Sequence, residues 1–147
     1  MHRPHAYAIA ICLVALAGPA FADEPLAEML RRVPGSTNAL AVIDVKALNA
    51  SPIARREGWR DRRQVLTDGT SFLPKNVDRI VLSSTIDFSV FHNVSNVTLV
   101  DLAINATTEA LIANERGTRD QVGGREVVWT PRNAYMVLLK ARLLAQF

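Results

Sequence analysis

The sequence predicts an α+β fold, in which a mainly antiparallel sheet carries two or three short helices on one face after a cleaved signal peptide. Three observations support this prediction. An apolar leader ends at a typical cleavage site, and several short apolar segments follow one another with few helices between them. One further segment has helical apolar spacing, and two others have residues typical of a helix start or end. The expected order is α-β-α-β-β-α-β-β.

Residues 1–22 have the layout of a secretory signal peptide. A positively charged start precedes an uncharged apolar run at 6–17, and Ala20 and Ala22 form a small-x-small site directly before Asp23. The run is shorter than the roughly 20 residues that a bilayer-spanning helix needs. We therefore predict cleavage after Ala22, export to the periplasm or the extracellular space, and no transmembrane anchor after cleavage.

The mature chain, expected to form a single domain at 23–147, excludes several function classes by its composition. The only cysteine, Cys12, leaves with the leader, so no disulfide or thiol chemistry is expected. The formal net charge of +3 falls to +2 once Arg3 is removed, which is too mild to favour a nucleic-acid partner. No cofactor-binding motif is present, and none is predicted.

The first half of the mature chain contains two helix signals and one strand signal. A stripe of apolar residues at helical spacing, with a proline in its first turn, predicts a helix within 23–35. The nearly continuous apolar run at 38–45 predicts a buried strand. Ser51 and the proline after it are typical of a helix start, and Gly58 leaves open whether one helix or two short helices follow.

The second half is dominated by strand patterns. Alternating apolar side chains over 80–88 predict a half-buried antiparallel strand. Residues 90–96, which include His92, are interpreted as a connection. The remaining elements are expected to be a strand at 97–105, a helix at 107–117 that ends at its glycine, and two strands at 124–130 and 133–140 joined by a proline-containing turn.

The last segment, 141–147, has two interpretations. Leu143, Leu144 and Phe147 resemble the first turn of a buried helix, yet the sequence stops there. Either a terminal helix packs on the sheet, or the chain is the N-terminal part of a longer protein.

The residue inventory offers little for catalysis. His92 is the only histidine of the mature chain, so a Ser-His pair would have to use it, and no nucleophile-elbow motif surrounds any nearby serine. The serines are Ser83, Ser84, Ser89 and Ser95. Scattered acids could hold calcium only if the fold brought them together, the acids being Asp87, Asp101, Asp120 and Glu126. We predict no catalytic residue and no metal site.

A dense arginine cluster supplies the candidate binding residues, which are Arg55, Arg56, Trp59, Arg60 and Arg63. Guanidinium groups pair bidentately with anions and stack on aromatic rings, so the cluster could bind a polyanion. The interleaved acids Glu57 and Asp61 favour the alternative of a solvated helix face with Trp59 turned toward the core.

Several segments resemble the start of secreted, uncharacterised bacterial proteins of the planctomycete type. The similarity lies in "VPGSTNALAVIDVKALNASPIARREGW", "FLPKNVDRIVLSS" and "GREVVWTPRNAYMV". It implies a longer parent protein and identifies no catalytic residue.

From these observations we expect an exported, non-enzymatic binding, scaffold or envelope-associated interaction domain, whose partner is an envelope polyanion or a protein. The alternative is an N-terminal fragment of a larger extracytoplasmic enzyme, hydrolase-like, whose site is completed by missing sequence.

Overall fold

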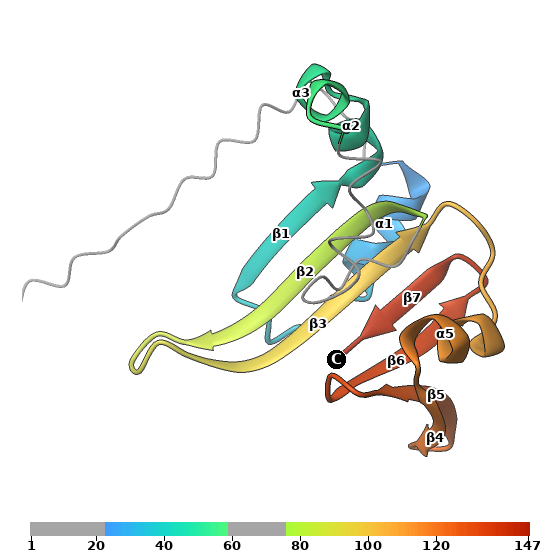
Figure 1. Cartoon of the computed structure of the whole chain (residues 1–147). Coiled ribbons are helices and arrows are strands. Elements are labelled where there is room, and N and C mark those ends of the chain that lie inside the picture. Colours follow the sequence, from blue (N-terminus) through green and yellow to red (C-terminus); the bar gives the residue numbers. More distant parts are fainter. Residues whose placement is uncertain (1–22, 59–75) are drawn as a thin grey trace, which may run out of the picture.

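The computed structural model describes residues 23–58 and 76–147, which form one seven-stranded sheet with the order β1-β2-β3-β7-β6-β5-β4 (Figure 1). Every neighbouring pair is antiparallel. The strands are β1 (Ala39–Asp44), β2 (Val77–Asp87), β3 (His92–Leu102), β4 (Thr118–Val122), β5 (Arg125–Thr130), β6 (Ala134–Lys140) and β7 (Leu143–Gln146). The helices are α1 (Glu24–Arg31), α2 (Val45–Ala50), α3 (Pro52–Arg56) and α5 (Thr108–Glu115). The α+β class is confirmed; the predicted leader lies outside the described residues.

Helix α1 forms where the sequence predicts it. The Asp23 carboxylate accepts a hydrogen bond from the Leu26 amide at 3.1 Å and so caps the first turn. The same carboxylate accepts a hydrogen bond at 2.8 Å from Arg79 on β2, which fixes the start of the helix to the sheet. Met29, on the inner face of α1, is buried.

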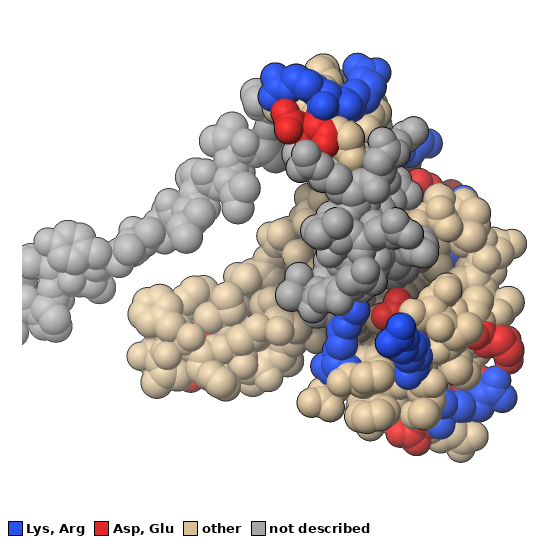
Figure 2. Space-filling model, in the orientation of Figure 1, with Lys and Arg blue, Asp and Glu red and all other residues tan. Residues whose placement is uncertain are grey.

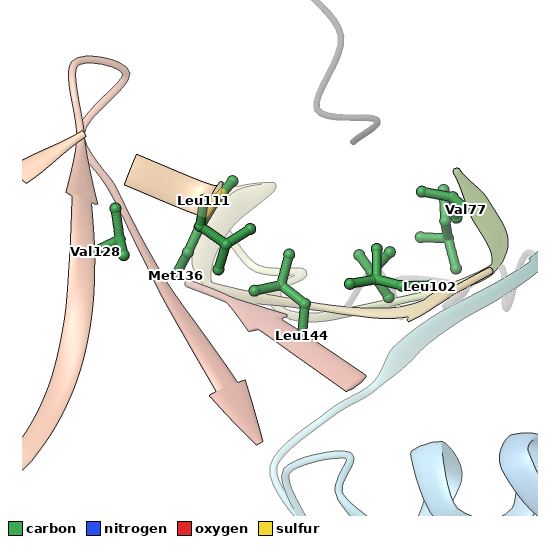
Figure 3. Packing of buried hydrophobic residues seen from close by; sticks show 8 residues of the cluster. Val77, Leu102, Leu111, Val128, Met136 and Leu144 are labelled. Atoms are coloured by element: carbon green, nitrogen blue, oxygen red, sulfur yellow. The ribbon is translucent and has the colours of Figure 1, made fainter. Parts of the chain in front are cut away.

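The helices cover both faces of the sheet, which corrects the expectation of a single covered face. On one face, Leu111 of α5 lies over a cluster that includes Val100 and Leu144 (Figure 3). On the other face, Met29 of α1 packs with Leu99 and Ala145. Because successive strand side chains point to opposite faces, the central strands β3 and β7 contribute to both clusters.

The two strands nearest the β1 edge also differ from their predicted burial. β1 was expected to be buried, but it lies at the edge of the sheet, where Leu40 and Val42 are exposed. In β2 the expected single buried face is wrong, because Ile80 and Val81 are buried on opposite faces while Leu82 is exposed.

The short helices after β1 are both capped by side chains. The Asp44 carboxylate accepts a hydrogen bond from the Ala47 amide at 2.7 Å and begins α2, which the sequence did not predict. The Ser51 hydroxyl accepts one from the Ala54 amide at 3.1 Å, which confirms the predicted start of α3.

The segment at 141–147 forms a central strand, β7, so the expected terminal helix is wrong. β7 lies between β3 and β6, with Leu144 opposite both Val100 and Leu138. This position joins the β1-β2-β3 part of the sheet to the β6-β5-β4 part, and Leu144 is completely buried.

Candidate functional site

The β2–β3 hairpin extends beyond the rest of the sheet. Pairing of β1 with β2 ends at Ser84, and pairing of β7 with β3 begins at Thr98. Among the described residues, 85–97 therefore pair as strands only within the β2–β3 hairpin, and we call them the arm. Figure 1 shows the arm projecting away from the sheet. The predicted connection at 90–96 is thus wrong, because from His92 onward it is the first half of β3.

The end of the arm exposes large apolar side chains. The exposed fractions are 59% for Phe88, 68% for Val90, 85% for Phe91 and 62% for Val94. Asp87 is the only acidic or basic residue of the arm apart from His92, and the arm surface in Figure 2 is almost entirely uncharged. A surface of this kind is typical of an interaction site.

The turn at the end of the arm places a bulky residue in a left-handed conformation. Phe91 has a φ of 50°, a region that L-residues with large side chains rarely adopt. Arg116, which also has a positive φ, caps the end of α5. The other described positions with positive φ are glycine or asparagine, namely Gly58, Gly123, Gly124, Asn76 and Asn133. The strain at Phe91 therefore favours a role for this side chain other than forming the turn.

We expect Phe91→Asn to raise the free energy of unfolding by about 0.5 to 1 kcal/mol, because asparagine tolerates the left-handed region better than phenylalanine. Urea denaturation followed by circular dichroism measures the change. Val90→Asn removes a similarly exposed apolar side chain and serves as the control, with no gain expected. A loss of stability in Phe91→Asn would contradict the assignment of strain.

Hydrogen bonds from the segment before β1 hold the base of the arm. The Asn38 side chain donates to the Ile86 carbonyl at 2.8 Å and accepts from the Ile86 amide at 2.9 Å. The Thr85 hydroxyl donates to the Ser36 carbonyl at 3.2 Å. The side chain of Asn38 thus continues, beyond the end of β1, the hydrogen bonding between β1 and β2.

Removal of this side chain tests how firmly the arm is held. In Asn38→Ala, exchange of the Ile86 amide proton is expected to accelerate at least about tenfold, because both bonds to the Asn38 side chain are lost. Hydrogen exchange followed by NMR gives the rate. Asn105→Ala removes an exposed asparagine outside the arm and is expected to leave that rate unchanged. Equal exchange rates in the two variants would show that the Asn38 side chain is not needed to hold the base of the arm.

A second surface feature is an apolar groove of about 400 Å³ on the α1 face. Its floor contains the buried side chains of Leu99, Val127 and Ala145, and its rim includes the exposed side chains of Val122 and Phe147. Strands from both halves of the sheet line this groove, so its shape depends on the central position of β7.

Two arginines also line this groove. Arg32 forms an ion pair with Glu28 at 2.8 Å, and Lys140 contacts the same carboxylate at 2.7 Å. Hydrogen bonds from Lys140 and Arg32 hold the pKa of Glu28 below its usual value. Arg125 is exposed and forms no ion pair within the described part of the chain. Among residues 23–58 and 76–147, the groove therefore offers at its edge a guanidinium that no carboxylate neutralises.

The structure places two of the five candidate binding residues. Arg55 and Arg56 are exposed on α3, and Arg56 forms an ion pair with Glu57 at 2.9 Å. In Figure 2 basic side chains gather over α2 and α3, with acidic ones beside them. Trp59, Arg60 and Arg63 lie outside the described residues, and so do Ala20 and Ala22 of the predicted cleavage site.

The residues considered for catalysis or metal binding do not converge. The Ser83 hydroxyl donates to the Val97 carbonyl at 2.9 Å, and the Ser89 hydroxyl donates to Asp87 at 2.6 Å rather than to His92. Asp101 lies beside Arg142 on another part of the sheet, and burial raises the pKa of this carboxyl. Over 23–58 and 76–147, no three histidine, cysteine or acidic residues are grouped as metal ligands.

No helix in the described segments is both long enough and apolar enough to cross a membrane.

No protein-family model, no curated protein and no solved structure matches this chain. The arm and the groove are the two surface features of the described residues that suit a binding role. The sequence offered one signal for the arm: four bulky apolar residues within 88–94, a segment without glycine or proline.

Proposed function

We propose that this chain is an exported, non-enzymatic interaction domain that binds a protein partner through the arm. The observation that carries the proposal is the group of exposed apolar side chains at the end of the arm, in particular Phe91. Aromatic side chains dominate the energetics of protein interfaces, because each buries a large apolar area with few rotatable bonds.

The construction of the arm supports this proposal. Asn38 holds its base, and Ser84 donates a hydrogen bond to the Asn96 side chain across the two strands at 2.6 Å. In the pairing of β2 with β3 the register shifts between Thr85 and Ile86, because Val94 on β3 is the extra residue of a β-bulge. Bulges are frequent near functional sites, and here the bulge lies among the exposed apolar residues.

The proposed compartment is supported by residues 1–22, which have the layout of a secretory signal peptide. A chain exported in this way meets its partner in the periplasm or outside the cell.

A polyanion is a second candidate partner, favoured by the exposed guanidinium of Arg55, which has no ion-pair partner within the described residues. Retention on a heparin column tests it. Arg55→Ala/Arg56→Ala should elute at lower salt than the wild type, and unchanged elution would exclude these two residues.

Site-specific photo-cross-linking tests the role of the arm. Benzoylphenylalanine replaces Phe91 in cells that naturally make the protein, and the adducts are identified by mass. Discrete adducts are expected at this position, but not when the same residue replaces Ile104, an exposed apolar side chain outside the arm. No adduct at residue 91, or the same adducts at both positions, would overturn the proposal.

A further inference from the structure

We propose that the protein partner is a second copy of this chain, and that the arm of one copy docks into the α1-face groove of the next. This inference rests on the proposed function of the arm and names its partner. It follows from three properties of the two surfaces: their shape, their polarity and their charge.

The end of the arm cannot reach the groove of its own copy. Val97, at the base of the arm, and Leu99 line the groove, while Phe91 lies at the end of the arm, six residues before Val97. At a rise of about 3.3 Å per residue, the end of the arm is roughly 20 Å away along an extended strand. Only the arm of another molecule can therefore enter.

Both surfaces are apolar, and one projects from the sheet while the other is concave. The end of the arm is a narrow two-stranded ribbon with Phe88, Val90 and Phe91 at its turn, and the groove is an open concave surface lined by eight apolar side chains. Docking would remove exposed apolar area from water on both partners at once, including the rim residues Val122 and Phe147.

The charges are also complementary. Asp87 precedes the apolar turn, and Arg125 lines the groove without an ion-pair partner in the described residues. The Ser89 hydroxyl and amide donate hydrogen bonds to one Asp87 oxygen, at 2.6 and 2.8 Å, and hold the pKa of the carboxyl below its usual value. An arm that enters the groove would therefore bring the Asp87 carboxylate toward the exposed Arg125 guanidinium.

The proposed contact joins different surfaces of the two copies, so it is heterologous. A contact of this kind leaves one free arm and one free groove on every dimer, and it continues into a ring or an open chain. The expected behaviour is a molecular mass that rises with concentration beyond that of a dimer.

Sedimentation velocity over a wide concentration range provides the first test. Wild-type protein is expected to form species larger than a dimer. Two double variants should each raise the concentration needed for association at least about tenfold: Val90→Ser/Phe91→Ser in the arm and Val122→Glu/Arg125→Glu in the groove. The control Lys46→Glu/Leu48→Glu makes matched changes on α2, where Leu48 is 46% exposed and Val122 is 44% exposed. This control should associate like the wild type.

A mixing experiment tests the direction of the contact. The arm variant retains an intact groove and the groove variant retains an intact arm, so the two together should form a 1:1 heterodimer that grows no further. Failure of this mixture to associate, while the wild type assembles, would overturn the arm-in-groove contact. Monomeric wild-type protein at all concentrations would overturn self-association altogether.

The cross-link at residue 91 separates this inference from the proposed function. An adduct whose mass corresponds to two copies supports both proposals. An adduct with a different protein supports the interaction domain and overturns the second-copy inference, and a complete lack of adducts overturns both.

Discussion

Leu144→Ala is expected to lower the free energy of unfolding by about 3 to 5 kcal/mol, because it removes a completely buried side chain and leaves a cavity in the centre of the sheet. Leu144 faces Val100 on β3 and Leu138 on β6. These neighbours belong to different halves of the sheet, so local collapse cannot fill the space without shifting one half. Such a loss is a large fraction of the stability of a typical small domain.

Chemical denaturation of Leu144→Ala and Leu40→Ala shows how the loss of stability depends on the position in the sheet, because both variants lose the same atoms. Leu40 lies on the edge strand β1 and is about half exposed. Its replacement is expected to cost less than about 1 kcal/mol. Similar losses in the two variants would contradict the central position of β7.

Gly117→Ala is expected to cost about 2 to 3 kcal/mol, because a Cβ atom at this position has no room. It would lie 2.5 Å from Cγ1 of Val128 and 2.8 Å from the backbone oxygen of Trp129. The backbone is fixed here as well, since the Gly117 amide donates to the Ile112 carbonyl at 3.0 Å where α5 passes into β4. Relief of the contact would therefore require β5 or α5 to move.

Gly35→Ala is the matched control, because nothing lies within 4 Å of the added Cβ and the backbone does not have a positive φ. Its stability should stay the same or rise by up to about 1 kcal/mol. Thermal or urea unfolding of the two variants gives the difference, and a Gly117→Ala protein as stable as Gly35→Ala would contradict the close approach of Gly117, between α5 and β4, to β5.

Elements defined by local chemistry could be predicted from the sequence. Asp23 caps α1, Ser51 caps α3 and Thr107 caps α5, and in each case the side chain accepts a hydrogen bond from an amide three residues later. The turn after β5 also forms as predicted, with the Asn133 amide donating to the Thr130 carbonyl at 3.0 Å. These contacts lie within a few residues, so the sequence around each element contains the whole signal.

Elements defined by distant partners could not be predicted in this way. Leu143, Leu144 and Phe147 have a spacing that suits a helix, but residues 143–146 pair with Thr98–Asp101, more than forty residues earlier. Pairing of this kind overrides local preference. The burial of β1 was predicted incorrectly for the same reason, because its position at the edge depends on the strand order of the whole sheet.

The candidate site was missed because its strand character comes from pairing. Residues 90–96 combine polar and apolar side chains without regular alternation, and the extra residue Val94 breaks the period. Only the opposite strand, through pairs such as Thr85 with Ser95, makes this segment extended. The arginine cluster, in contrast, was visible in the sequence, and its Arg55 and Arg56 are exposed as a binding role requires.

The central claim is that the arm stands clear of the sheet and presents its apolar end. A distance measured by electron paramagnetic resonance tests it most directly, with spin labels on cysteines placed at Ser89 and Ala103 in a Cys12→Ser background. The eleven residues of β3 at about 3.3 Å each give an expected separation of roughly 35 to 40 Å with a narrow distribution. A broad distribution, or a separation below about 25 Å, would show that the arm folds back and would contradict the claim.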